Sequence, residues 1–187
     1  ELEDPGDMAS DGSHTVFTTA TEVWILDAED ELYVLAEDQQ APFEPAVGAS
    51  GAFWLAEDAL WLHGHDEETL VVAEGLDEPY DLLVDGETAY VTTQGDAALW
   101  SIGIDSGEAV TEHMFEDIPH CIAEGPDGRI YATTRSFLWP YAGWVLSIDA
   151  GEADRLSQTP PEPERVRAGD GSVVWSSKQS LTYVDAE

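Results

Sequence analysis

Positive charge is almost absent from this chain. Six lysines and arginines face 40 aspartates and glutamates among 187 residues, which gives a formal net charge of −34 at pH 7. No lysine or arginine occurs before Arg129. Proteins that bind nucleic acid or an anionic membrane surface use basic side chains to neutralise phosphate. The composition therefore excludes both classes of partner.

Cysteine and long apolar runs are also scarce. Cys121 is the single cysteine, so no internal disulfide bond can form, and this criterion leaves the compartment open. No run of about 18 apolar residues is present, which excludes a membrane-spanning helix. The chain begins with glutamate and lacks an apolar leader, so we expect a processed product or a fragment. We expect this product to be exported, to an extracellular or periplasmic location.

A repeat of about 40 residues is present instead. Each copy begins at a proline, and Pro79–Thr93 and Pro119–Thr134 show it best: a short apolar run, a turn with Asp-Gly or Gly-Pro-Asp-Gly, an aromatic residue and Thr-Thr. A period of this size is typical of propellers and repeat arrays. The five copies start at Pro5, Pro42, Pro79, Pro119 and Pro163.

Each repeat contains about four strand-like segments and no sustained helical period. In the third copy we predict strands at 82–84, 89–93, 99–104 and 108–115. Asp85-Gly86 separates the first two, as in a tight hairpin. Four antiparallel strands per repeat predict an all-β propeller with five blade-like repeats, forming a single domain over residues 1–187.

The two ends of the chain leave two arrangements open. The fifth repeat stops after its third strand, and Glu1–Asp4 could supply the missing outer strand. Either five blades close into a ring with a stunted last sheet, or the chain is a piece of a larger propeller.

A tryptophan recurs in three of the predicted third strands. Trp61, Trp100 and Trp144 each precede an aspartate by five residues. A large aromatic side chain at one place in each blade suits the wedge between neighbouring sheets, and a ligand box is the alternative. We favour packing.

The acidity also has two interpretations. Carboxylates spread evenly over all repeats favour a halotolerant protein, soluble in a salty or divalent-rich medium whose counterions screen the self-repulsion. The alternative is a surface that binds cations or a basic partner.

The repeat pattern Pro-x-x-Ile/Leu-x-x-x-Asp-Gly-x-x-Tyr-x-Thr-Thr resembles that of NHL-type propellers. It is also similar to the repeats of gluconolactonase and strictosidine-synthase-like proteins and of virginiamycin B lyase-like proteins. The resemblance covers most of the chain and is strongest over residues 78–149. It implies the propeller fold, whereas the functions of these families range from lactonases and lyases to sensors and protein-binding modules. They usually have six or seven blades, and this chain shows five.

The enzymes of this group place metal-binding side chains around the central channel, where the first strands begin. The resemblance puts Asp7, Glu44, Asp81, Cys121 and Arg165 at these positions. Asp7, Glu44 and Asp81 could hold Ca²⁺ through carboxylate oxygens. The positive charge of Arg165 and the lack of any asparagine oppose this. A calcium-assisted lyase or hydrolase is therefore our alternative function.

Three histidine or cysteine motifs carry potential chemistry. His120 and Cys121 are adjacent in a strand, so we expect their side chains to point to opposite faces and Cys121 to be buried and inert. His120 is either a structural residue, or a general acid or ligand contact. His63 and His65 share one strand face, either as a transition-metal pair without a third ligand or as a solvent-facing pair.

The fourth repeat carries an irregular aromatic insertion over residues 135–143, between its second and third strands. It is either a recognition loop or a plug in which Phe137 and Leu138 fill the propeller mouth. Our leading prediction is a non-enzymatic recognition or assembly module that binds a protein or a small ligand on this face. The predicted contact residues are Arg135, Trp139 and Tyr141, with Tyr80, Asp81 and His120 as the adjoining floor.

Overall fold

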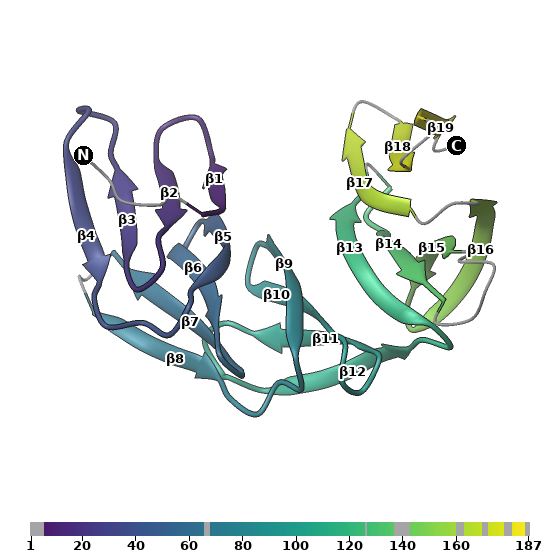
Figure 1. Cartoon of the computed structure of the whole chain (residues 1–187), viewed down its shortest axis with the longest axis horizontal. Coiled ribbons are helices and arrows are strands. Elements are labelled where there is room, and N and C mark those ends of the chain that lie inside the picture. The colour runs from purple at the N-terminus through teal and green to yellow at the C-terminus, as the bar shows by residue number, and fades with distance from the viewer. Residues whose placement is uncertain are drawn as a thin grey trace. The chain divides into compact units, whose positions relative to one another are not determined.

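The computed structural model describes residues 6–65, 68–125, 127–136, 143–159, 163–169, 172–177 and 181–185. Within these ranges, the backbone alone is described for residues 157–159, 163–165, 168–169, 177 and 181–185. The described residues form nineteen β-strands and no helix (Figure 1). In this part of the chain there is consequently no helix of the length and apolarity needed to cross a membrane.

The strands form five sheets, in each of which consecutive strands are neighbours. The first sheet contains β1 (Met8–Ser10), β2 (Thr15–Thr18), β3 (Val23–Leu26) and β4 (Leu32–Ala36). The second contains β5 (Phe43–Gly48), β6 (Gly51–Ala56), β7 (Ala59–Gly64) and β8 (Thr69–Ala73). The third contains β9 (Pro79–Asp85), β10 (Thr88–Thr93), β11 (Ala98–Gly103) and β12 (Ala109–Met114).

The remaining two sheets follow the same order. The fourth contains β13 (Ile118–Glu124), β14 (Ile130–Arg135), β15 (Gly143–Asp149) and β16 (Glu152–Thr159). The fifth has three strands in the described residues, β17 (Pro163–Gly169), β18 (Ser172–Ser177) and β19 (Leu181–Asp185). The predicted repeat of four antiparallel strands is thus confirmed. Residues 1–5, which include Pro5 and the proposed outer strand at 1–4, lie outside the described residues.

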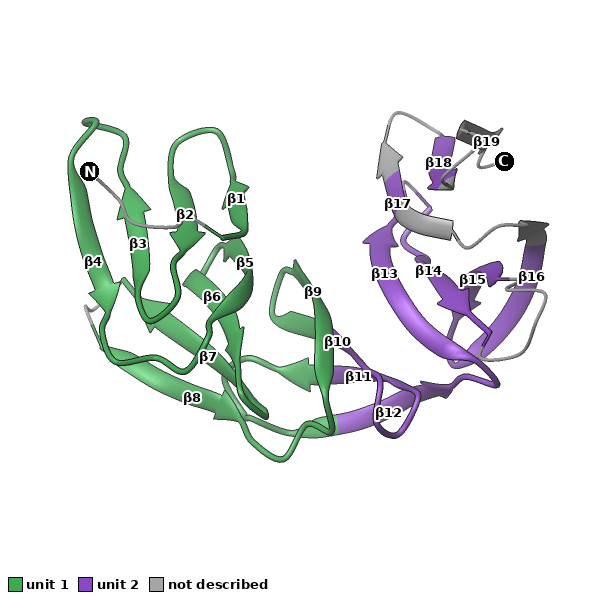
Figure 2. Cartoon of the chain, in the orientation of Figure 1, with its two compact units in different colours: residues 1–90, 102–109 green, residues 91–101, 110–187 purple. Residues whose placement is uncertain are grey.

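The chain divides into two compact units (Figure 2). Unit 1 comprises residues 1–90 and 102–109, and unit 2 comprises residues 91–101 and 110–187. The division passes through the third sheet. Within unit 1, the first strand of each sheet lies beside the next, β1 against β5 and β5 against β9. Within unit 2, β17 lies beside β13.

The core of each unit lies between neighbouring sheets. In unit 1, residues of β2, β3 and β4 pack against β6, and Trp54 is fully buried among them. All six residues of β6 are buried because this strand has a neighbouring sheet on each side. In unit 2, Tyr131 and Val145 of the fourth sheet pack against Val166 and Trp175 of the fifth. Apolar burial of this kind, at about 25 cal/mol per Å², is the main force that holds adjacent sheets together.

The predicted Asp-Gly hairpins are confirmed in the described part of the chain. Gly12, Gly86 and Gly128 have φ angles of 93°, 55° and 77°. A Cβ at any of the three would meet nothing within 4 Å, so the left-handed backbone, and not crowding, calls for glycine. Asp170-Gly171 lies outside the described residues.

The three repeat-related tryptophans are half-buried in contacts within their own units. Trp61 stacks on Trp54 with ring centroids 6.4 Å apart and packs against the core of unit 1. The indole N–H of Trp100 donates to the Thr93 hydroxyl at 3.1 Å. Trp144 carries the Arg155 guanidinium over its ring at 4.4 Å. These contacts support the packing interpretation, most directly for Trp61.

Candidate functional site

Each sheet has two ends that differ in chemistry. We call the end at which the first strand begins, and where the second strand turns into the third, the proline end of the sheet. The opposite end, with the turns between first and second and between third and fourth strands, is the hairpin end. All the site residues predicted from the repeat positions belong to proline ends.

Three of the first strands, β5, β13 and β17, are irregular at their proline ends. Pairing between β5 and β6 shifts between Phe43 and Ala46, and pairing between β13 and β14 shifts between Pro119 and Ile122. A similar shift interrupts β17 directly after Pro163. Each shift is a β-bulge, in which extra residues of one strand face a shorter stretch of the partner. Bulges re-aim side chains, and here they act on the positions that follow the repeat proline.

The bulge in β13 corrects one prediction about His120 and Cys121. Adjacent strand residues were expected to point apart, but the Cys121 Sγ lies 4.0 Å from the His120 Nδ1. The expectation was wrong because both residues fall within the bulge, facing Thr133, whose hydroxyl accepts a hydrogen bond from the Cys121 N–H at 3.0 Å. Cys121 is half-buried and packs against the core cluster of unit 2, as a structural cysteine does.

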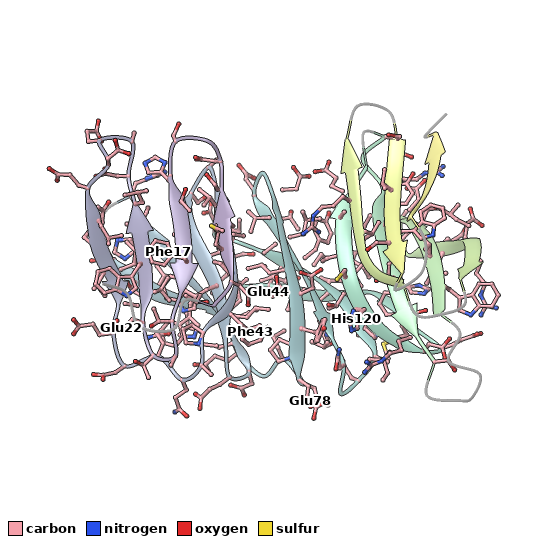
Figure 3. The ribbon with its side chains drawn as sticks, turned by 45° about the horizontal axis from the view of Figure 1, so that its top comes forward. Phe17, Glu22, Phe43, Glu44, Glu78 and His120 are labelled. Carbon is pink, nitrogen blue, oxygen red and sulfur yellow. The ribbon has the colours of Figure 1, made fainter. Side chains whose placement is uncertain are left out.

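A hollow of about 680 Å³ lies at the proline ends of unit 1. We call it the proline-end hollow. Phe43 supplies apolar surface and Glu78 supplies a carboxylate (Figure 3). Glu57 supplies a second carboxylate. Polar groups complete the lining at Thr21, Gln39 and Gln40. Gln39 is held in place, because its backbone N–H donates to the Thr21 carbonyl at 2.9 Å and its side chain accepts from Trp54 at 3.1 Å.

Left-handed backbone conformations at residues other than glycine gather around this hollow. Ala41, Glu57 and Glu78 line it and have φ angles of 47°, 54° and 53°. Glu44, at 42°, lies in the neighbouring bulge. A residue with a Cβ loses on the order of 1 kcal/mol in this conformation compared with the ordinary region. Strain of this kind is concentrated at binding and catalytic sites in proteins.

The carboxylates predicted to hold calcium have individual partners. The Asp7 carboxylate accepts a hydrogen bond from the Glu44 backbone N–H at 3.4 Å. Asp81 is 9% exposed, and its carboxylate accepts from the Leu82 N–H at 3.0 Å. Among the described residues, no three histidine, cysteine, aspartate or glutamate side chains gather in a way that could hold a metal ion. Calcium binding by Asp7, Glu44 and Asp81 therefore gains no support and stays a prediction.

The predicted contact residues fall into three groups. Tyr80 and Asp81 lie at the start of β9 in unit 1. His120 and Arg135 lie in unit 2, where the end of β14 pairs Arg135 with Ile118 of β13 and with Gly143 of β15. This pairing places the start of the insertion at the proline end of its sheet, as predicted. Trp139 and Tyr141, with Phe137 and Leu138, lie outside the described residues.

Sequence reasoning missed Glu57, Glu78 and the two glutamines of the proline-end hollow. Glu57 turns β6 into β7, and Glu78 directly precedes Pro79. One signal could have found them, since turns between second and third strands share an end with the repeat prolines. The left-handed conformation gave no signal, because glutamate and alanine do not favour it.

His63 and His65 lie at the hairpin end of unit 1. As expected from their alternate spacing, both line one hollow, of about 630 Å³. The Nδ1 of His63 is 2.8 Å from the Thr69 hydroxyl, and the Nε2 of His65 is 2.9 Å from the Ala49 carbonyl oxygen. The sequence did not indicate that His14 lines the same hollow.

Comparisons with known proteins identify the fold of the chain. No family model and no curated protein matches the sequence. The chain is similar to a solved chain of a nidogen/laminin complex, with a TM-score of 0.76 and 14% identity, over 97% of this chain and 76% of that one. It is similar to hydrazine synthase of Kuenenia stuttgartiensis, with a TM-score of 0.72 and 18% identity, over 94% of this chain and 56% of that one.

A third similar structure is a catalytically inactive virginiamycin B lyase from Staphylococcus aureus with quinupristin. The TM-score is 0.67 and the identity 13%, over 98% of this chain and 70% of the lyase. The chain thus spans between about half and three quarters of the length of these three structures. At these identities the likeness concerns the fold and carries no activity with it. The chain has the β-propeller fold, as its repeat predicted.

Proposed function

We propose that this chain is a non-enzymatic recognition module that binds its partner at proline ends. The observation that carries the proposal is the left-handed backbone at Ala41, Glu57 and Glu78, all of which line the proline-end hollow. Glycine adopts this conformation without the steric strain that a Cβ brings. The presence of this strained backbone around a hollow supports a binding role.

The chemistry of the proline-end hollow indicates the partner. Its charged groups are two exposed carboxylates, and unit 1 contains no lysine or arginine to offset them. Phe43 adds a half-buried aromatic surface. A protein segment that presents lysine or arginine next to an apolar residue complements this lining in charge and in polarity. Fluorescence polarisation with a labelled hexalysine peptide tests the charge component directly.

The decisive comparison uses two pairs of substitutions that remove the same charge. Glu57→Gln with Glu78→Gln should weaken hexalysine binding about fivefold in 0.15 M NaCl, because both carboxylates line the hollow. Glu29→Gln with Glu31→Gln, exposed at a hairpin end, should change it less than about twofold. Equal losses in the two pairs would show that the peptide senses net charge alone, which would refute the proline-end site.

In unit 2 the proposal rests on the insertion after Arg135. We propose that Arg135, Trp139 and Tyr141 form its binding surface, with His120 beside them. Replacing Trp139 and Tyr141 by alanine should leave the melting temperature nearly unchanged and abolish partner binding. A variant that unfolds would identify the insertion as a core plug. Export to the cell exterior or periplasm remains a further part of the proposal.

A further inference from the structure

The histidines of unit 1 share one location. Unit 1 contains no lysine or arginine, so histidine is the only side chain in it that can carry positive charge. Its three histidines, His14, His63 and His65, all line the hollow of about 630 Å³ at the hairpin end. We call this the histidine hollow. All the side chains of unit 1 that can carry positive charge therefore line one hollow.

Local contacts hold each ring at the wall of the hollow. Asp11 accepts hydrogen bonds from the backbone N–H groups of Ser13 and His14, both at 2.7 Å, which fixes the turn that carries His14. The hydroxyl of Thr69, at the start of β8, contacts the His63 ring, and the carbonyl of Ala49, in the turn between β5 and β6, contacts the His65 ring. The rings reach the hollow from the first and second sheets of the unit.

The floor of the hollow is apolar. Ile25, Leu35 and Ala52 are 8%, 9% and 4% exposed and belong to the core of the unit. Tyr33, 46% exposed, adds an aromatic surface at the rim. A volume of this size suits a small molecule with an apolar body.

The charged side chains that line the hollow determine which polar group of that molecule they can bind. The titratable side chains that line the hollow are Asp11, Tyr33 and the three histidines. Hydrogen bonds from the His14 and Ser13 N–H groups hold the pKa of Asp11 below its usual 3.8, so Asp11 stays ionised and offsets one imidazolium. Each imidazole that carries a second proton adds one positive charge to this lining. Imidazolium N–H groups donate strong hydrogen bonds to carboxylate oxygens.

From this arrangement we propose that the histidine hollow binds a small carboxylic acid with an apolar body, more tightly as the pH falls from 8 to 5.5. The site is separate from the proline-end hollow and does not depend on the function proposed there. It would give unit 1, which lacks lysine and arginine, a place that accepts an anion.

Two matched probes test the proposal by ¹⁹F NMR: 4-(trifluoromethyl)benzoate and the corresponding benzyl alcohol. Measurements in 0.5 M NaCl screen the general repulsion between the protein and the anion. The benzoate should bind at pH 5.5 at least about tenfold more tightly than at pH 8, because a protonated imidazole donates a stronger hydrogen bond to a carboxylate than a neutral one does. The alcohol should show no such dependence on pH.

Substitutions locate the binding. His63→Gln with His65→Gln should remove the dependence on pH and most of the benzoate binding, whereas His113→Gln in unit 2 should change neither. Far-ultraviolet circular dichroism checks that the variants fold, and His65→Gln alone serves if the double variant does not. Absence of benzoate binding at pH 5.5, equal binding at pH 8, or binding retained in the histidine variants would overturn the proposal.

Discussion

Unit 1 and unit 2 share a strand pattern and differ in the number of lysines and arginines that can pair with their carboxylates. Unit 1 contains no lysine or arginine, and unit 2 contains all six. In unit 2, Arg129 lies 3.6 Å from an Asp127 oxygen and 3.7 Å from an Asp149 oxygen, and Arg155 pairs with Glu116. In unit 1 we expect cations from the solvent to screen the repulsion between carboxylates. Carboxylates of unit 2 can thus pair with lysine or arginine of the same unit, whereas those of unit 1 cannot.

The largest expected effect is that of salt. Raising NaCl from 0.05 M to 1 M should raise the melting temperature by about 10 °C, because screening relieves the repulsion of a chain with net charge −34. Differential scanning calorimetry measures the whole chain, and hydrogen exchange resolves the units. Amides of unit 1 should gain more protection than those of unit 2. Equal gains would show that salt stabilises the two units to the same extent. An unchanged melting temperature would show that self-repulsion is small.

A smaller effect compares one buried tryptophan in each unit. The Trp54 indole N–H donates to Gln39 at 3.1 Å, whereas the Trp175 indole nitrogen is buried without a hydrogen-bond partner among the described residues. Trp54→Phe should therefore cost about 1 kcal/mol more in free energy of unfolding than Trp175→Phe, since it alone breaks a hydrogen bond. Urea unfolding of both variants measures the difference. A larger loss at Trp175 would mean that packing volume outweighs the hydrogen bond.

The two units should also respond to opposite extremes of pH. In unit 1 the lowered pKa of Asp11 contributes stability above pH 3.8 that is lost as the pH falls through the folded value. In unit 2, burial and the hydrogen bond to Asp127 raise the pKa of Tyr131 above 10.0, so its contribution is present below pH 10 and lost at higher pH.

Two substitutions isolate these contributions. Asp11→Asn should flatten the acid side of the stability curve, and Tyr131→Phe should flatten the alkaline side. Chemical unfolding at closely spaced pH values gives each difference curve against the wild type. A variant curve parallel to that of the wild type at its own extreme would refute the assignment for that residue.

The smallest effect concerns Arg155. Its guanidinium lies over Trp144 and pairs with Glu116, but the side chain is exposed. Arg155→Gln should cost about 0.5–1 kcal/mol in low salt and less in 1 M NaCl, where the ion pair is screened and the ring contact remains. Arg129→Gln, which has ion pairs and no ring contact in the described residues, is the control. A loss that does not change with salt would assign the effect to the ring contact alone.

The sequence predicted the strands well because each depends on local alternation and on Asp-Gly turns such as Asp85-Gly86. It predicted the site less well. The bulge that brings His120 to Cys121 depends on pairing with β14, and no local pattern encodes it. The position of His14 and His65 around one hollow depends on how the first and second sheets pack against each other. The left-handed conformations of Glu57 and Glu78 are imposed by tertiary structure against local preference.

The bulges after the repeat prolines have a consequence for how such a chain can change. A bulge absorbs its extra residues locally, so the pairing that follows, such as Ile122 with Ala132, continues undisturbed. The bulged positions of the chain hold residues as different as Glu44 and His120, while the strands beyond them keep one pattern. These positions therefore accommodate different side chains. A protein engineer could install a new ligand-binding side chain there, one repeat at a time, without redesigning the blade that carries it.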